Sequence, residues 1–283
     1  MSLMVAAGPF GHAPQGRFNF ERPRRDGVIY WEPSPRRVRG ILGDEVVVDS
    51  HRVMLLHETG HMPVWYFPRE DVRAELLESS QRTTRCPWKG EARYWSVRAG
   101  DRVASDAVWA YPEPIEDAPP LAGYVAFQWD AMDRWLEEDE EVHVHVRDPY
   151  HRVDVLPSSR HVRVSLEGEL LAESDRPLAL FETALPPRWY LSPADVRTDL
   201  LEPCAEVRTG CPYKGEAEYR PVRVGDRVER ALVWTYADPR RQVAPIAGRL
   251  CFFDERVDLE LDGELQERPR TQWSSPDWAG QPG

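Results

Sequence analysis

Hydrophobic and polar residues alternate along most of the chain, and turn-forming pairs interrupt the alternation at intervals. Four segments of this kind are residues 38–48, 94–111, 162–171 and 219–236. Their turn pairs are Gly43-Asp44, Gly100-Asp101, Glu167-Gly168 and Gly225-Asp226. Alternation on both sides of a short glycine-containing turn is typical of a β-hairpin. The pattern therefore predicts a mainly β protein with antiparallel sheets.

Only one short helix is expected in each half of the chain. Ser192 followed by Pro193 is typical of a helix cap and first turn, and it predicts a helix over residues 194–201. The corresponding helix of the first half, within residues 68–77, begins less clearly.

The two halves of the chain repeat each other. The motif Cys-Pro-Trp-Lys-Gly-Glu-Ala-Arg-Tyr at residues 86–94 recurs as Cys-Pro-Tyr-Lys-Gly-Glu-Ala-Glu-Tyr at residues 211–219. Over the first 18 positions from each cysteine, 13 are identical, which chance does not produce. The offset is 125 here and 124 upstream, where Trp65 recurs as Trp189. We infer an internal duplication of one β-rich domain.

The duplication sets the expected domain boundaries. They are an N-terminal arm (1–26), a first repeat domain (27–133), an acidic segment (134–150), a second repeat domain (151–262) and a C-terminal tail (263–283). The arm is rich in Gly, Pro and Arg and is expected to be flexible, without a signal for export. The acidic segment has no recognisable counterpart in the other half, and we expect it to form a strand that bridges the halves.

The charge and cysteine content narrow the class of protein. The net charge is −12, and no basic stripe is visible, so nucleic-acid binding is not expected. No hydrophobic run approaches the ~20 residues of a membrane-spanning helix, so no membrane partner is expected. Of the four cysteines only Cys86 and Cys211 recur at the repeat offset, which does not suit a disulfide framework. We therefore expect a cytoplasmic protein.

The repeated motif holds the only two lysines among 36 basic residues, Lys89 and Lys214. Proline and glycine around each lysine predict a tight turn that projects its side chain from a fixed backbone. An amine, unlike a guanidinium, can lose its proton and act as a base or a nucleophile. The alternative is a lysine stem lying over an aromatic ring with its charge in water.

The motif also contains Cys86 and Cys211, which a neighbouring ammonium could activate as thiolates. The alternative for both is a buried and inert thiol. Glu91 and Glu216 are the acids inside the motif, and Glu91 together with Tyr94 would support covalent or acid–base work by Lys89 or Cys86.

Each half is also rich in aromatic residues that recur at the repeat offset. They are Trp65, Trp88, Tyr94, Trp109 and Tyr111 in the first half and Trp189, Tyr213, Tyr219, Trp234 and Tyr236 in the second. Such rings are core residues by default, but tryptophan and tyrosine also line ligand clefts. We expect some of them to form a cleft with the lysine at its rim.

No metal site and no cofactor are expected. Residues 57–61 read His-Glu-Thr-Gly-His, but the zinc pattern H-E-x-x-H requires a helix, and here a glycine and the nearby Pro63 oppose one. The second copy, residues 181–185, lacks both histidines. His143, His145 and His151 are expected on a surface strand rather than around a metal.

Several of these motifs together resemble the domain of unknown function 427 family, in a tandem form similar to that of high-GC actinobacteria. They are Tyr66-Phe67-Pro68, Cys86-Pro87-Trp88-Lys89-Gly90, Tyr94, Trp109-x-Tyr111-Pro112-x-Pro114 and Ala122-Gly123-x-x-Ala126-Phe127. The resemblance implies β-tent-like domains, in which two antiparallel sheets meet over a cleft. Relatives with this fold carry Cys-x-x-Cys zinc knuckles, which this chain lacks.

The resemblance also implies a nucleotidyltransferase-like label, which requires carboxylates that hold Mg²⁺. The acids near the motif kept in both copies are Glu91 and Glu216 with the turn residues Asp101 and Asp226, so this activity is not expected.

Three hypotheses for function remain open. The first is a module that binds a small anionic or carbonyl-bearing ligand in an aromatic cleft with Lys89 or Lys214 at its rim. The second is an enzyme that uses Lys89 or Cys86, and it requires the lysine to lie near another titratable group in a cleft. The third is a protein-interaction scaffold, which requires a solvated lysine and an exposed apolar patch.

Overall fold

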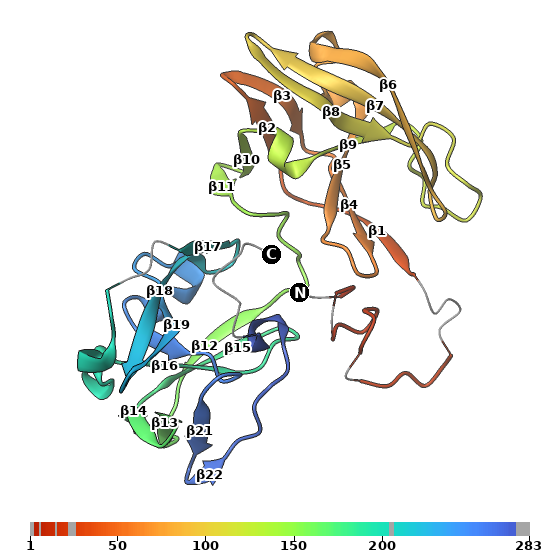
Figure 1. Ribbon diagram of the computed structural model, residues 1–283. Coiled ribbons are helices and arrows are strands. Elements are labelled where there is room, and N and C mark those ends of the chain that lie inside the picture. The colour runs from red at the N-terminus through yellow and green to blue at the C-terminus, as the bar shows by residue number, and fades with distance from the viewer. Residues whose placement is uncertain (1–2, 6, 15, 22–26, 204–206, 276–283) are drawn as a thin grey trace. The chain divides into compact units, whose positions relative to one another are not determined.

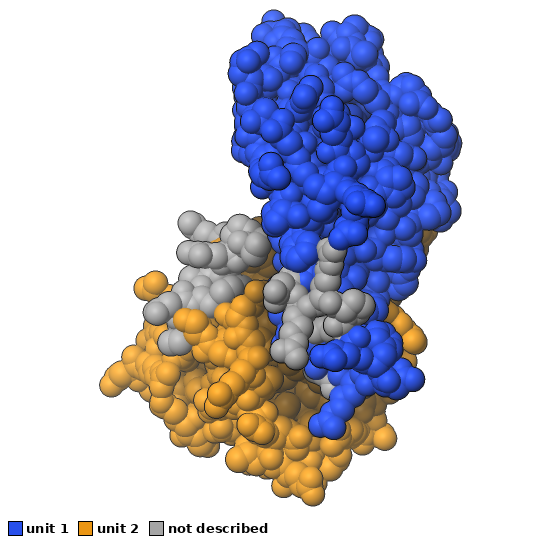
Figure 2. Space-filling model, turned by 90° about the vertical axis from the view of Figure 1, so that its right-hand side faces the viewer, with its two compact units in different colours: residues 1–150 blue, residues 151–283 orange. Residues whose placement is uncertain are grey.

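The computed structural model describes residues 3–5, 7–14, 16–21, 27–203 and 207–275. The chain forms two compact units, residues 1–150 and residues 151–283 (Figures 1 and 2). Each unit contains one seven-stranded and one four-stranded sheet, and every strand pair in them is antiparallel. The predicted mainly β fold in two tandem domains is confirmed. Within the described residues, no helix has the length and apolar character to span a membrane.

The first unit contains eleven strands in its described part. They are β1 (Ile29–Pro33), β2 (Val38–Leu42), β3 (Glu45–Ser50), β4 (Met54–Glu58), β5 (Val64–Pro68), β6 (Leu77–Cys86), β7 (Gly90–Ala99), β8 (Arg102–Ala110), β9 (Tyr124–Phe127), β10 (Arg134–Glu137) and β11 (Glu140–Val142). The seven-stranded sheet has the order β1-β4-β5-β9-β8-β7-β6, and the four-stranded sheet has the order β11-β10-β2-β3.

The second unit repeats this topology strand for strand. Its strands are β12 (Val153–Pro157), β13 (Val162–Leu166), β14 (Glu169–Ser174), β15 (Leu178–Glu182), β16 (Arg188–Leu191), β17 (Arg208–Cys211), β18 (Gly215–Val224), β19 (Arg227–Thr235), β20 (Leu250–Phe252), β21 (Asp258–Leu261) and β22 (Glu264–Leu265). The sheet orders are β12-β15-β16-β20-β19-β18-β17 and β14-β13-β21-β22. A position in one unit can therefore be compared directly with its counterpart in the other.

All four predicted hairpins are present, as β2–β3, β7–β8, β13–β14 and β18–β19. Their turns contain Gly43, Gly100, Gly168 and Gly225, each with a positive φ between 56° and 84°. Glycine adopts this backbone region without the steric strain that a Cβ atom causes. The turn signals in the sequence therefore identified the hairpins correctly.

The predicted short helices are shorter than expected. Each consists of two single-turn 3-10 helices: η1 (Arg69–Asp71) and η2 (Ala74–Leu76) in the first unit, η4 (Pro193–Asp195) and η5 (Thr198–Leu200) in the second. Ser192 caps η4 as predicted, because its side chain accepts a hydrogen bond from the Ala194 amide. Between the turns, Val72 and Val196 are extended and bridge to β3 and β14. A continuous helix would lose that pairing.

Three further 3-10 turns complete the described helical content. They are η3 (Trp129–Ala131), η6 (Arg241–Ile246) and η7 (Gln272–Ser274). Residues 263–275, expected to be a tail, contain β22 and η7, and Thr271 in this segment donates a hydrogen bond to Glu255.

Residues 134–150 belong to the first unit. Strand β10 pairs with β2 and with β11, so this segment completes the four-stranded sheet of the first unit. Its counterpart in the second unit is β21, which pairs with β13 in the same register. The sequence did not reveal this correspondence because Trp135 on β10 is replaced by Leu259 on β21, and no paired position within the two strands is identical.

The N-terminal segment, expected to be a flexible arm, packs on the first unit where it is described. The Met4 carbonyl accepts a hydrogen bond from the Gly60 amide, and the Phe10 carbonyl accepts one from the Thr59 hydroxyl. The Met4 side chain is buried.

The seven-stranded sheet of the first unit is apolar on both faces. On β5, Trp65 belongs to a buried cluster shared with the four-stranded sheet, whereas its neighbour Tyr66 belongs to a separate cluster with Tyr94 and Tyr111. Consecutive residues of a strand point to opposite faces, so the two clusters lie on opposite sides of the sheet. The predicted site residues are divided between these two faces.

Candidate functional site

The repeated Cys-Pro-aromatic-Lys-Gly motif is a hairpin loop. Cys86 and Gly90 face each other at the ends of β6 and β7, and Cys211 and Gly215 do so in the second unit. The carbonyl of the loop lysine accepts a hydrogen bond from a neighbouring chain segment in both units, at 3.2 Å for Lys89 and 2.9 Å for Lys214. The predicted tight turn is therefore present twice.

The glycine of the motif is required by the backbone. Gly90 has φ of 107°, and a Cβ atom there would lie 3.1 Å from the Glu113 carbonyl oxygen. Gly215 has φ of 106°, and its Cβ atom would lie 3.2 Å from the Asp238 carbonyl oxygen. The retention of this glycine reflects loop geometry and close backbone approach.

Replacing Gly90 with alanine is expected to lower the free energy of unfolding by about 1–3 kcal/mol, because the new Cβ atom adds backbone strain and a close contact with a carbonyl. Chemical denaturation measures this loss. The matched control is Gly100→Ala, where φ is 58° and no atom lies within 4 Å of the new Cβ. A loss for Gly90→Ala no larger than that of the control would contradict the proposed close approach.

Each loop lysine forms a largely buried ion pair with a glutamate at the end of a neighbouring strand. Lys89 Nζ donates to Glu58 Oε2 on β4, and Lys214 Nζ donates to Glu182 Oε2 on β15. Lys89 is only 8% exposed, and its Nζ lies 5.8 Å from the centroid of the Tyr111 ring. Neither lysine is the solvated side chain that the alternative interpretation required.

The charges of the second pair are strongly stabilised. Burial by itself lowers the pKa of the Lys214 ammonium, but the adjacent Glu182 carboxylate outweighs this effect and holds the pKa above its ordinary value. Burial by itself raises the pKa of Glu182, but Lys214 and His151 lower it to about 2. Lys214 is therefore an ammonium at neutral pH, which does not favour its use as a base or nucleophile.

His151 is a third member of the second pair. Its Nε2 lies 3.0 Å from Glu182 Oε1, and its ring stacks on Tyr213 with centroids 3.9 Å apart. The expectation that His151 lies on a surface strand was wrong, because its side chain is 1% exposed. The corresponding residue of the first unit is Gly27, where a Cβ atom would lie 3.4 Å from the Trp88 ring.

The sequence analysis missed Glu58 and Glu182. The available signal was the dipeptide Glu-Thr, which recurs at the upstream offset, since 58 + 124 = 182. Glu58 lies inside the H-E-x-x-H pattern, but residues 54–58 form strand β4, so His57 and Glu58 point to opposite faces. His57 instead lies 2.9 Å from Glu32. In the part of the chain that the structure describes, no three His, Cys, Asp or Glu residues are grouped as metal ligands.

Tyrosine and tryptophan residues of the motif and of neighbouring strands form hydrogen bonds of their own. Tyr94 lies 2.8 Å from the Thr84 hydroxyl, Tyr219 lies 2.6 Å from the Thr209 hydroxyl, and Trp234 donates to Tyr190. Burial raises the pKa of Tyr111, Tyr190 and Tyr236, so these phenols stay protonated.

The cysteines of the motif are partly buried, whereas its glutamates are exposed. Cys86 packs against the Tyr66 cluster and, like Cys211, is partly buried. Glu91 and Glu216 are exposed, and Glu216 pairs with Arg208. The glutamates that bind the lysines are thus Glu58 and Glu182, not the acids within the motif.

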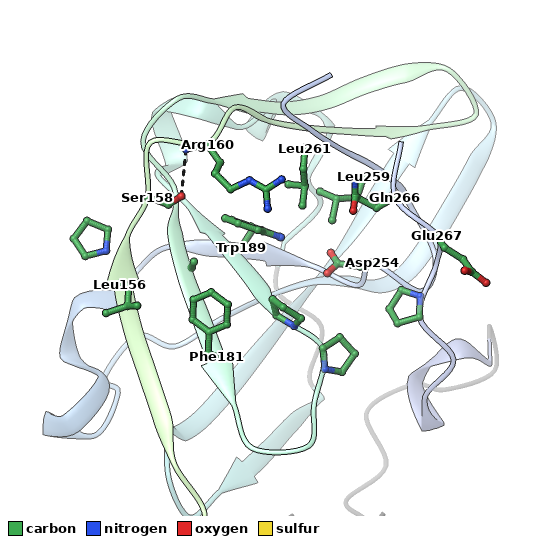
Figure 3. A pocket seen from close by; sticks show the side chains of 15 residues that line it. Leu156, Ser158, Arg160, Phe181, Trp189, Asp254, Leu259, Leu261, Gln266 and Glu267 are labelled. Atoms are coloured by element: carbon green, nitrogen blue, oxygen red, sulfur yellow. Dashed lines mark hydrogen bonds between the residues drawn. The ribbon is translucent and has the colours of Figure 1, made fainter. Parts of the chain in front are cut away.

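Each unit also contains a cavity on the other face of the seven-stranded sheet. In the first unit it has a volume of about 190 Å³ and is bordered by Trp65, Trp109, Trp129 and Trp135. In the second unit it has a volume of about 480 Å³ (Figure 3). That cavity is lined by Leu156, Pro157, Ser158, Arg160, Ala179, Phe181, Pro186, Pro187, Trp189, Asp254, Leu259, Leu261, Gln266, Glu267 and Pro269.

The cavities differ in size because indole rings fill the first one. Trp129 and Trp135 stack with centroids 5.8 Å apart, and Trp135 lies 5.6 Å from Trp65. The counterparts of these two rings in the second unit are Asp254, at offset 125, and Leu259, at offset 124. The smaller side chains leave open the space in front of Trp189.

The structure places the predicted site residues in more than one region of each unit. Trp65 and Trp189 border the cavities, and Trp109, which packs against the Tyr66 cluster, reaches the border of the first one. Lys89 and Lys214 are not among the residues that line them. Lys89 lies beside Tyr111 of the Tyr66 cluster, and Lys214 pairs with Glu182, so these cavities do not have a lysine at the rim. Sequence reasoning missed Arg160, Asp254, Phe181 and Leu259, because only positions shared by both copies drew attention.

Residues 30–138 and 154–263 each match one family, the domain of unknown function DUF427. The chain belongs to this family. Its two DUF427 copies coincide with the two structural units, as the resemblance predicted. No curated protein matches the chain. In this DUF427 protein the ion pair is common to both copies, whereas the large cavity is specific to the second.

Proposed function

We propose that the protein binds a small molecule in the cavity of the second unit. The observation that carries this proposal is a volume of about 480 Å³ at a position where the first copy is filled by tryptophan rings. Ligand pockets typically enclose 300–1,000 Å³ and combine apolar walls with a few polar groups. Here Phe181, Trp189 and Leu259 supply apolar wall, and Arg160 and Asp254 supply charge.

The ion pair between Lys214 and Glu182 supports a binding protein rather than an enzyme that uses the lysine. Lys214 is held as an ammonium by Glu182, so its best-supported role is to fix the hairpin loop against the sheet. This favours the binding module over an enzyme that uses the lysine as base or nucleophile. A cytoplasmic location is part of the proposal, and it is supported by the three described cysteines, Cys86, Cys211 and Cys251, which are all free.

The test fills the cavity with the residues of the first unit. In the first unit, Trp135 packs against Gly40 on the neighbouring strand. A Cβ atom at residue 40 would lie 2.6 Å from the indole ring, so a tryptophan at this position requires glycine opposite it. The double variant Leu259→Trp with Val164→Gly reproduces this pair in the second unit. A neutral apolar probe, 2-(2-naphthyl)ethanol at millimolar concentration, is expected to raise the melting temperature of the wild type, because a ligand that binds only the folded state stabilises it.

The double variant is expected to lose this rise. Trp135→Phe in the first unit is the control, and it should keep the ligand-dependent rise because it leaves the second cavity unaltered. A rise of equal size in the double variant and the wild type would place the probe elsewhere and contradict the proposal.

A further inference from the structure

The charged side chains that line the cavity of the second unit differ in their ion-pair partners and in their exposure to solvent. The Arg160 guanidinium lies 5.6 Å from the centroid of the Trp189 ring, and its Nε donates to Asp262 at 2.7 Å. Its charge is therefore compensated by a carboxylate. Glu267 is exposed to solvent. Asp254, in contrast, is only 7% exposed and is directed into the cavity beside Trp189 (Figure 3).

Asp254 shares its nearest cation with a second buried acid. Arg188 binds Glu255 through two hydrogen bonds of 2.6 and 2.9 Å, and Arg188 Nη1 is 3.5 Å from Asp254 Oδ2. One guanidinium thus faces two carboxylates. When all three groups are ionised, the wall of the cavity carries one uncompensated negative charge.

This arrangement is unfavourable in the absence of a further cation. Burial raises the pKa of Asp254 to about 7, with Arg188 opposing the rise and Glu255 adding to it. The first unit avoids the problem, because Val64 stands at the position of Arg188 and the described lining of its cavity contains Trp129 and no carboxylate. A buried acid that costs stability and faces a cavity is typical of a functional site.

We infer that the cavity of the second unit selects hydrophobic amines, with the ammonium on the Asp254 carboxylate and the apolar body against Trp189 and Phe181. This inference rests on the proposed function and names its ligand class. An ammonium–carboxylate contact is a charge-assisted hydrogen bond, and it is strengthened where water is excluded. An aromatic or branched aliphatic body fits walls formed by leucine, proline and aromatic side chains.

The inference predicts a pH dependence with a definite sign. The ammonium binds the ionised carboxylate, so affinity should rise as the pH increases through about 7, where Asp254 loses its proton. Ionisable groups near Asp254 include Arg188, Glu255 and the Cys251 thiol, whose pKa burial raises. Arg160 and Glu267 line the same cavity. Arg188 stays charged over this range, so the profile reports Asp254.

The experiment is a calorimetric titration of the full chain with three probes that share one apolar body: 2-(2-naphthyl)ethylammonium, 2-(2-naphthyl)ethanol and 3-(2-naphthyl)propanoate. At pH 8 the ammonium is expected to bind about 10-fold or more tightly than the alcohol, and the carboxylate most weakly. Asp254→Asn should abolish the preference for the ammonium. The matched control Glu267→Gln, another acid that lines the cavity, should keep it.

The outcomes separate this inference from the proposed function. Equal affinity for the ammonium and the alcohol, or a preference that survives Asp254→Asn, overturns the inference while binding of the alcohol still supports a ligand cavity. Binding of none of the three probes overturns both. A wild-type affinity for the ammonium that falls as the pH rises from 5.5 to 8.5 also overturns the inference, and it does so independently of any variant.

Discussion

Replacing Glu182 with alanine is expected to lower the free energy of unfolding of the second unit by about 3–5 kcal/mol, because the Lys214 ammonium would remain buried without its carboxylate. Hydrogen–deuterium exchange during chemical denaturation measures the loss and assigns it to the second unit. The control is Arg98→Ala in the exposed pair Arg98–Glu78, where a loss below about 1 kcal/mol is expected.

The effect of Glu182→Ala should depend on pH. The folded-state pKa of Glu182 is lowered from 4.5 to about 2, so its stabilisation is complete above the unfolded pKa and declines as the pH falls toward 2. The pKa of Lys214 is raised above 10.5, so its stabilisation is complete below 10.5 and declines at higher pH. The difference between wild type and variant should therefore be constant near neutrality and shrink at pH 3.

A double variant distinguishes a buried pair from a general loss of packing. Glu182→Leu combined with Lys214→Met removes both charges, so it should lower the free energy of unfolding less than Glu182→Ala alone does. The contradicting result is a loss of unfolding free energy for Glu182→Ala that is no larger than the loss for Arg98→Ala. The Lys214–Glu182 pair would then stabilise the protein no more than an exposed ion pair does, and it would not anchor the loop.

Replacing Arg188 with alanine is expected to lower the free energy of unfolding by about 3–5 kcal/mol at pH 8, because two buried carboxylates lose their shared cation. Glu255 has no exposed side-chain surface, and Asp254 has little. Denaturation midpoints at pH 8 and pH 5 measure the effect.

The variant should be relatively more stable at pH 5 than at pH 8. Without Arg188, burial raises the folded-state pKa of both acids above their unfolded values, so ionisation on raising the pH opposes folding. Arg188→Met combined with Glu255→Leu should cost less than Arg188→Ala, since it removes a cation and an anion together. A loss for Arg188→Ala that is small and independent of pH would contradict this account of the charged wall.

The sequence predicted the fold from features that act locally. Gly43, Gly100, Gly168 and Gly225 terminate alternating runs, and each lies in a hairpin turn because glycine tolerates a positive φ. The motif around Lys89 and Lys214 identified the rigid loop for the same reason. The helices were over-predicted, because Val72 and Val196 gain more by pairing with a strand than by continuing a turn.

The partners of the site were harder to predict because they depend on contacts between distant strands. Glu58 meets Lys89 only after β4 and the hairpin loop are brought together, and a single repeated glutamate does not indicate this. The cavity depends on a difference between the copies, Asp254 and Leu259 in place of two tryptophans. A comparison of the two repeats that looks for identical residues does not detect positions at which the repeats differ.

Fluorine NMR of the full chain labelled with 5-fluorotryptophan tests the central claim most directly. The chain has eleven tryptophans, and Trp189→Phe and Trp65→Phe assign the two signals of interest. Titration with 2-(2-naphthyl)ethylammonium should shift the Trp189 signal and leave the Trp65 signal unchanged, since the cavity beside Trp189 is about 480 Å³ and the cavity beside Trp65, narrowed by indole rings, is about 190 Å³. A Trp189 signal that does not move, or equal shifts of both signals, would contradict a ligand site specific to the second unit.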